Sequence, residues 1–257
     1  MKGIIKSQFF QLKNHRASIL AFVGVALVQI ITIFGNMGVG IRTGGEVTAD
    51  IMALITPINF LPLFVIVGQI CCGDFHDKTT NYELMSGHQR YEVYFGRVIP
   101  TLIVGSISTL LLIIVMPVGT TILSGWGNSL DIGDVMIRYS LIMVINVRVI
   151  CEAIMFAFLL KNQYVIMGLG YGFLMAVVTM GLGTENTNDS FLLSITNLRR
   201  VTFIDYWLTY GLHSEGNLVY DSALPVGDVL GTIIASLIFG AICLALGYIF
   251  FRRDDLN

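Results

Sequence analysis

Side chains that could bind a metal ion gather in one short stretch of this sequence. The stretch holds two thiols, two carboxylates and two imidazoles, from Cys71, Cys72, Asp74, His76, Asp77 and His88. Their spacing matches no closed zinc pattern, and a polar loop beside two small apolar thiols explains them equally well. We therefore predict no metal site here.

Groups that could perform catalysis do not stand out elsewhere. We find no Ser-His-Asp or Cys-His set, no paired-carboxylate site and no Gly-x-x-x-x-Gly-Lys-Ser/Thr loop to hold phosphates. We predict that the chain is not an enzyme and binds no cofactor by itself. Its net charge of −2, with no basic groove, also argues against a nucleic-acid partner.

One charged pair lies inside an apolar run. Arg148 and Glu152 are one helical turn apart, with Asn146 nearby. A charge in the membrane costs several kcal/mol unless it is paired, so such residues are functional candidates. Three interpretations stay open: the pair lines a transport path, it is a structural ion pair, or it relays protons in a secondary transporter.

The elements around these residues are membrane helices. The 257 residues are 55% hydrophobic and 12% charged, with a mean hydropathy of +0.78. A helix needs about 20 apolar residues to cross the hydrocarbon core. We expect one all-α transmembrane domain, residues 1–257, with six spans at about 17–36, 51–72, 97–123, 135–160, 162–183 and 229–251.

The distribution of Lys and Arg predicts the orientation of these spans. With both termini in the cytoplasm, ten such residues lie inside and four outside, which favours this topology. The inside set is Lys2, Lys6, Lys13, Arg16, Lys78, Arg90, Arg97, Lys161, Arg252 and Arg253, and the outside set is Arg42, Arg138, Arg199 and Arg200. We expect no cleaved signal peptide and no extracellular disulfide.

Residues 1–16 show a short apolar stripe with helical spacing. The stripe consists of Met1, Ile4, Ile5, Phe9 and Leu12, and lysines flank it. It predicts a helix at the membrane interface that leads into the first span. A frayed basic tail that only sets the topology is the alternative.

The loop between the second and third spans contains helix signals. Thr80-Asn81-Tyr82-Glu83 fits a capping box, and Gly87 can adopt the left-handed conformation that ends a helix. The third span then begins after Arg90, with an interfacial belt formed by Tyr91, Val93, Tyr94 and Phe95. A plain connection would need fewer residues, so we predict a helical elbow on which another protein can act.

Two other segments carry patterns. Between spans five and six lie about 45 residues, in which Phe203, Tyr206, Trp207 and Tyr210 have the spacing of an amphipathic helix. A small folded extracellular cap is the alternative. In span five, Gly168, Gly170 and Gly172 predict close helix packing or a subunit contact rather than a potassium filter, since the run continues as a helix.

Two stretches carry a resemblance to a known family. One holds Asp74, Thr79, Leu84, Met85, Arg90, Gly96 and Arg97, and the other is the tail Phe250, Phe251, Arg252, Arg253, Asp254 and Leu256. In these residues the chain resembles the permease subunits of type-2 ABC exporters, the group with ABCG-like (type V) architecture. Lys78 and Gln89 depart from the usual pattern of that group.

The resemblance implies a coupling helix at residues 77–90 that docks on a separate cytosolic ABC ATPase. In that role Thr80 and Glu83 hold the helix, Tyr82, Leu84 and Met85 enter the ATPase, and Arg90 fixes the exit; Asp77 begins the segment. It further implies a homodimer of permeases in the bacterial plasma membrane, with ATP and Mg²⁺ bound by the partner.

The same resemblance implies that residues 203–210 form a re-entrant outer gate. Small permeases of this group suggest export of amphipathic, antimicrobial or toxin peptides, with lipid-like molecules or drugs next. An ion-coupled secondary transporter that uses Arg148 and Glu152, or an immunity protein that binds a peptide without transporting it, are the alternatives.

Overall fold

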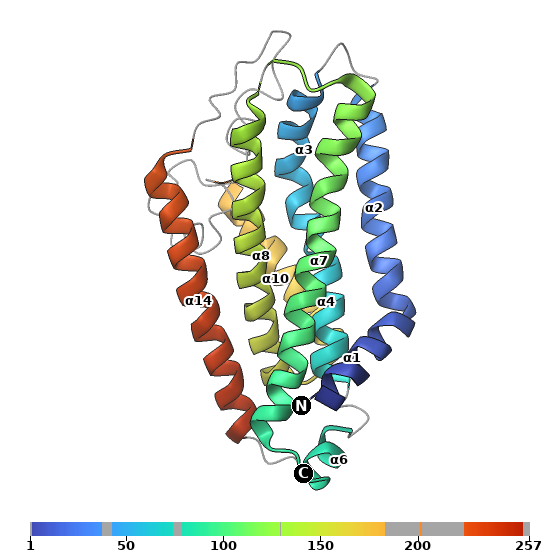
Figure 1. The fold of residues 1–257 in the computed structure, drawn as a ribbon, viewed down its shortest axis with the longest axis vertical. Coiled ribbons are helices and arrows are strands. Elements are labelled where there is room, and N and C mark those ends of the chain that lie inside the picture. The colour runs from blue at the N-terminus through green and yellow to red at the C-terminus, as the bar shows by residue number, and fades with distance from the viewer. Residues whose placement is uncertain are drawn as a thin grey trace.

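The computed structural model describes residues 2–37, 43–73, 79–128, 130–182, 201 and 224–253. This part of the chain is helical and contains no strand (Figure 1). The long helices run side by side. Helix α1 (Lys2–Asn14), helix α6 (Thr79–Met85) and the last turn of α14 (Val226–Arg253) lie at one end of the bundle, called the α6 end below.

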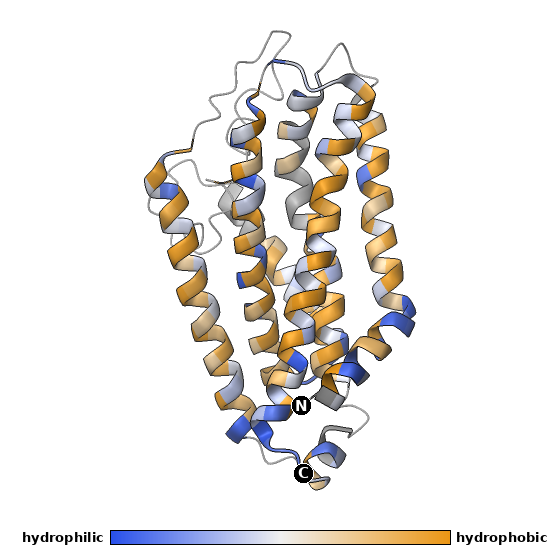
Figure 2. Cartoon of the chain, viewed as in Figure 1, coloured by the Kyte–Doolittle hydropathy of each residue, from blue (hydrophilic) through white to orange (hydrophobic). Residues whose placement is uncertain are grey.

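Among the described residues, four helices are long and apolar enough to cross a membrane: α2 (Arg16–Met37), α7 (Arg90–Ser124), α8 (Ile132–Leu160) and α14. They coincide with four of the predicted spans, 17–36, 97–123, 135–160 and 229–251. Hydrophobic residues cover their middle lengths, whereas hydrophilic residues gather at the α6 end (Figure 2). The fold is therefore that of a helical membrane protein.

The predicted span 51–72 differs from the helices observed there. Helix α3 begins earlier, at Gly44, and ends at Asn59; α4 (Leu61–Val67) and the π-helix η1 (Gly68–Cys72) follow. Pro62 causes the break at Phe60, because it has no N–H for the carbonyl one turn earlier. Glu46 stabilises the earlier start of α3, because its carboxylate accepts a hydrogen bond from the Thr43 N–H at 3.3 Å.

The predicted span 162–183 is also divided. It consists of α9 (Gln163–Val165), the π-helix η2 (Ile166–Gly170) and α10 (Tyr171–Leu182), which together form a continuous apolar helical run with a π-helical turn in its first half. Lys161 adopts a left-handed φ of 52°, and the Asn162 side chain caps α9. Helix α8 thus reverses into α9 within two residues, Lys161 and Asn162.

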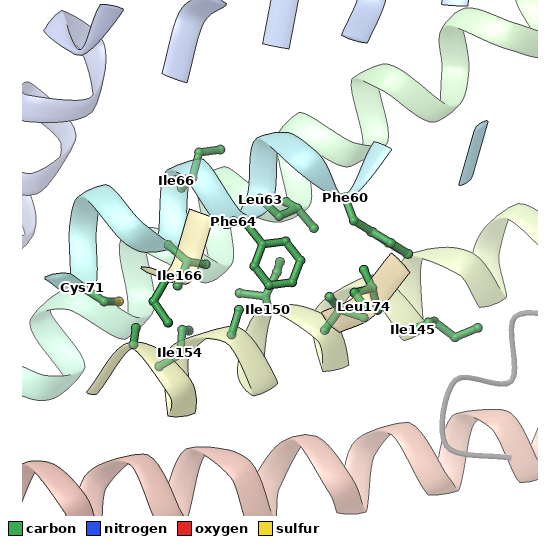
Figure 3. Close-up of a cluster of buried hydrophobic side chains, with 14 of the residues drawn as sticks. Phe60, Leu63, Phe64, Ile66, Cys71, Ile145, Ile150, Ile154, Ile166 and Leu174 are labelled. Atoms are coloured by element: carbon green, nitrogen blue, oxygen red, sulfur yellow. The ribbon is translucent and has the colours of Figure 1, made fainter. Parts of the chain in front are cut away.

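The core lies where α4, α8 and η2 to α10 meet (Figure 3). Its side chains include Phe60, Leu63, Phe64, Ile150, Ile154, Ile166 and Leu174. Buried polar pairs join other helices: Gln29 donates to Asn59 at 2.6 Å, and Thr109 donates to Asn146 at 3.2 Å. In an apolar environment such contacts fix which helices pair.

Helix α14 packs mainly on α8 through a stripe of small residues. The buried face is Thr232, Ser236, Gly240, Cys243, Gly247 and Phe251. A Cβ at Gly247 would lie 3.3 Å from the Cα of Met155 and 2.9 Å from the hydroxyl of Tyr94. Small residues at this spacing let two membrane helices approach closely. The sequence pattern predicts such close helix packing for span five instead.

The glycines of span five do not all pack as predicted. A Cβ at Gly168 or Gly172 would meet nothing within 4 Å, and only Gly170 approaches a ring, that of Phe64 at 3.0 Å. Close helix packing inside one chain is therefore wrong for Gly168 and Gly172, whereas the alternative of a subunit contact stays a prediction.

Candidate functional site

Helix α6 occupies the position at which the sequence predicts a short helix between two spans. It ends as predicted: Gly87 has a φ of 93°, and its N–H donates to the Leu84 carbonyl at 3.1 Å. The helix begins at Thr79, so Thr80 lies within its first turn instead of at its N-cap. The side chain of Thr80 and the whole of Asp77 lie outside the described residues.

Glu83 connects α6 to the membrane helix that follows. One of its carboxylate oxygens lies 2.9 Å from Nη2 of Arg97, whose side chain is 0% exposed. The sequence predicts a capping role for Glu83, and its patterns do not pair Glu83 with Arg97. The buried guanidinium donates a charge-assisted hydrogen bond to this carboxylate, so α6 is fastened to the side of α7.

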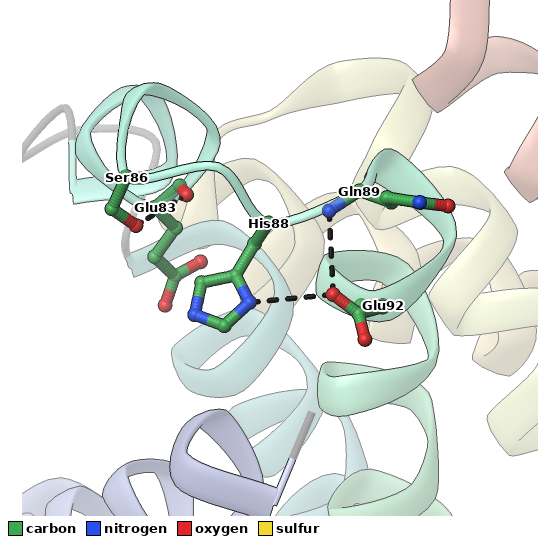
Figure 4. A network of polar contacts seen from close by, with 5 residues as sticks. All are labelled: Glu83, Ser86, His88, Gln89 and Glu92. Atoms are coloured by element: carbon green, nitrogen blue, oxygen red, sulfur yellow. Dashed lines mark hydrogen bonds and ion pairs between the residues drawn. The ribbon is translucent and has the colours of Figure 1, made fainter.

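A second carboxylate organises the exit from α6 (Figure 4). Glu92 Oε2 accepts a hydrogen bond from the Gln89 N–H at 3.3 Å and lies 3.3 Å from Nδ1 of His88. Gln89 and Glu92 therefore cap the start of α7. Directly after α6, the Ser86 hydroxyl donates to the Glu83 carbonyl at 2.7 Å.

Arg90 ties the start of α7 to the end of α14. Its guanidinium donates to the carbonyls of Arg252 at 2.6 Å and Phe251 at 3.4 Å. These are carbonyls of the last helical turn, where a positive charge also interacts favourably with the helix dipole. The predicted fixing role of Arg90 thus has a defined contact in this chain.

The exposed surface of α6 is smaller than the predicted docking set. Tyr82 is 67% exposed and Met85 is 82% exposed, whereas Leu84 packs partly against the core of its own chain. Tyr82 and Met85 are called the α6 tip below. The α6 tip is therefore accessible from outside the bundle, while Leu84 and Glu83 hold the helix from beneath.

Helix α1 reaches the same region. Its buried face is Ile4, Gln8 and Leu12, whereas Phe9 and Phe10 are exposed. Phe9 therefore lies outside the buried face, although the predicted stripe included it. Ile4 lies against Gly96, at which an added Cβ would meet its Cγ2 at 2.9 Å. Gly96 precedes Arg97, so α1 and α6 contact neighbouring positions of α7.

Arg148 and Glu152 form the predicted pair inside the bundle. Nε of Arg148 lies 3.2 Å from Oε1 of Glu152, and the two side chains are 2% and 23% exposed. Asn146, which the sequence places nearby, bonds to Thr109 on α7 instead. The guanidinium of Arg148 lies 6.0 Å from the ring centroid of Phe239 on α14.

A cavity of about 510 Å³ adjoins this pair. Residues of α4, α8, η2, α10 and α14 line it, among them Phe64, Glu152, Phe156, Leu169, Phe173 and Phe239. Most of the lining is aliphatic or aromatic, which is typical of a site for an apolar ligand. Sequence analysis missed the cavity, because its walls come from segments far apart in the chain.

The remaining predicted site residues are those of the predicted outer gate. Phe203, Tyr206, Trp207 and Tyr210 lie outside the described residues. Nearby, the Val201 carbonyl accepts a hydrogen bond at 2.8 Å from the buried Arg138, which the sequence placed in the outside set. Cys71, Cys72, Cys151 and Cys243 are buried, and none of them is in a disulfide.

Cys72 and His88, two of the candidate metal ligands between residues 71 and 88, lie in different surroundings. Cys72 is buried and donates to the Ala157 carbonyl at 3.4 Å, whereas His88 is exposed at the start of α7. Asp74 and His76 lie outside the described residues. The described residues contain no group of three or more candidate metal ligands.

No protein-family model matches this chain, and no curated protein matches it.

Proposed function

We propose that this chain is the transmembrane permease subunit of a type-2 ABC exporter, with α6 as its coupling helix. The observation that carries the proposal is the contact between Glu83 and Arg97 at 2.9 Å. It fastens a short, otherwise exposed helix to a membrane helix, so a force on the α6 tip is passed to α7. Arg90 extends this connection to α14.

The proposal includes the finer architecture expected from the sequence. The two divided segments, α3 to η1 and α9 to α10, supply the second and fifth of six spans, and both termini face the cytoplasm of a bacterial cell. The α6 end is then cytoplasmic. Two copies of the chain form a homodimer, and a separate cytosolic ATPase binds ATP and Mg²⁺. Residues 203–210 gate the outer mouth.

The substrate in this proposal is an amphipathic peptide of the antimicrobial or toxin type. Such a peptide partitions into the membrane, so an exporter meets it in or near the bilayer. The many apolar side chains exposed on the long helices provide lipid contact and leave room for a second copy of the chain.

Co-purification tests the docking surface. The chain is expressed with each ABC ATPase encoded near its gene, as wild type and as the double variant Tyr82→Arg, Met85→Arg. Both positions are exposed, so the variant keeps the Glu83 contact and the fold. We expect the wild type to retain one ATPase and the variant to lose it, and peptide to stimulate ATP hydrolysis by the wild-type complex.

Tyr164→Arg is the matched control, because Tyr164 is 72% exposed and follows α8 at the same end of the bundle. The control should retain the ATPase. If the α6-tip variant binds as well as the wild type, α6 is not the coupling helix. If no ATPase binds the wild type, the exporter proposal fails.

One observation favours a second candidate, an ion-coupled secondary transporter. Glu152 lines a cavity and pairs with Arg148, an arrangement that could bind and release a proton or cation during transport. Purified chain in liposomes, without any ATPase, distinguishes the two: peptide or drug uptake driven by a pH gradient, and lost in Glu152→Gln, would support this candidate.

A further inference from the structure

The cavity beside Glu152 has a definite length and direction. Its lining on α8 runs from Val149 to Leu160, which spans about 16 Å at 1.5 Å per residue. On the facing side it runs from Ile166 to Leu174, along η2 and α10. The space is therefore elongated along the helix axes, the shape of a single hydrocarbon chain rather than of a compact molecule.

The mouth of the cavity lies within the apolar part of the bundle. Leu169 is 70% exposed and Phe173 is also exposed, and both line the cavity. They belong to the apolar helical segment Gln163–Ala176. A ligand that enters past these side chains comes from the lipid phase, because no water is present at that level of a bilayer.

The polar group on the wall selects the head of the ligand. Glu152 is the one charged side chain among the described residues that line the cavity; its Oε1 lies 3.2 Å from Arg148 Nε, and its side chain remains 23% exposed. Arg148 lies behind it, off the cavity wall, and neutralises its charge. The cavity thus presents an acceptor in a site of no net charge.

An acceptor of this kind favours a ligand that donates a hydrogen bond and carries no charge of its own. A cation or anion would need a counter-ion at this depth, which the Arg148–Glu152 pair does not supply. A ligand without a donor would cover the exposed part of the Glu152 side chain without supplying a hydrogen bond to its carboxylate.

We propose that this cavity binds an uncharged, single-chain amphiphile from the bilayer, with its hydrocarbon chain between α8 and α10 and a hydrogen-bond-donating head at Glu152. The site lies within one copy of the chain, and it is independent of whether an ATPase docks on α6. It can hold a lipid-like cargo or a resident lipid, both of which share this chemistry.

Native mass spectrometry of the purified chain in detergent tests the proposal with three probes of equal chain length. Monolauroylglycerol has hydroxyl donors, methyl laurate has only acceptors, and laurate is an anion. We expect one monolauroylglycerol per chain, bound about tenfold more tightly than either of the others, since a hydrogen bond to a charged group is worth at least this factor. Equal binding of all three probes would overturn the proposal.

Two variants connect the binding to this cavity. Leu169→Trp fills the mouth, and Leu237→Trp makes the same change at a residue of α14 that is 61% exposed and does not line the cavity. We expect Leu169→Trp to bind monolauroylglycerol about tenfold more weakly than the wild type, and Leu237→Trp to bind it as well as the wild type. Equal binding in the two variants would place the ligand elsewhere.

The double variant Arg148→Met, Glu152→Leu tests the head-group contact. It replaces the ion pair by apolar side chains of similar size and leaves no charge unpaired, a change that folds commonly tolerate. We expect the variant to bind methyl laurate as well as monolauroylglycerol. A preference for monolauroylglycerol that survives in the folded variant would show that Glu152 does not recognise the head.

Discussion

Nη2 of Arg97 lies 2.9 Å from the carboxylate of Glu83, although the two residues are 14 positions apart and belong to different helices. Helix α6 must fold back along α7 for this contact to form. The exposed α6 tip is therefore anchored to a membrane helix through the buried side chain of Arg97.

Replacing Glu83 by Ala should destabilise the protein strongly. The change removes the carboxylate from a guanidinium that is fully buried, and the cost of such a change is about 3 kcal/mol or more. The free energy of unfolding, measured by SDS titration, checks this value. Glu92→Ala is the comparison, because it removes only a cap at the exposed start of α7 and should cost about 1 kcal/mol. Equal losses would contradict a special role for Glu83.

Gly96→Ala should disturb the contact of α1 with α7. The added Cβ would lie 2.9 Å from Cγ2 of Ile4, so α1 must shift, at a cost of about 1–3 kcal/mol. Ile4→Ala removes the obstructing atom. We expect the double variant Ile4→Ala, Gly96→Ala to be more stable than the sum of the single effects predicts. Strict additivity in a thermal unfolding assay would show that the two residues do not touch.

Gly247→Ala should loosen α14 from α8. Its Cβ would lie 3.3 Å from the Met155 Cα and 2.9 Å from the Tyr94 hydroxyl, and a backbone atom cannot rotate away. We expect a loss of about 1–3 kcal/mol. Gly231→Ala, on the same helix with nothing within 4 Å, should gain up to about 1 kcal/mol from helix propensity. Thermal unfolding in detergent compares the two, and a loss in both would mean that the packing stripe is wrongly assigned.

The Arg148–Glu152 pair should show strong non-additivity. Glu152→Leu alone leaves the buried Arg148 without its carboxylate and should cost about 3–5 kcal/mol. Adding Arg148→Met removes the stranded charge, so the double variant should recover most of this loss. A double variant less stable than Glu152→Leu would indicate that Arg148 has a structural role beyond the pair.

Sequence patterns predict the long elements of this fold well. Uninterrupted apolar runs mark α2, α8 and α14 to within about three residues, because backbone hydrogen bonds in such runs are satisfied locally; α7 begins at Arg90, seven residues before the predicted start at 97. The break at Phe60 could also be found, since Pro62 follows it directly.

Contacts between distant segments are less accessible to sequence reasoning. Glu83 and Arg97 have no fixed spacing that would pair them, although a charge within an apolar helix is itself a signal that a partner exists. The small-residue face of α14 has a readable period, yet only the structure shows that α8 covers it. The cavity has no sequence signal, because its walls come from five helical segments.

Helix α8 turns into α9 within Lys161 and Asn162, so this connection hardly projects from the bundle. Among the connections described at the α6 end, α6 is then the one that projects from the bundle. A force applied to one chain at this single point can push or pull the bundle, but it defines no axis of rotation. Two chains side by side would offer two such points, and a partner that rotates the membrane helices would need to act on both.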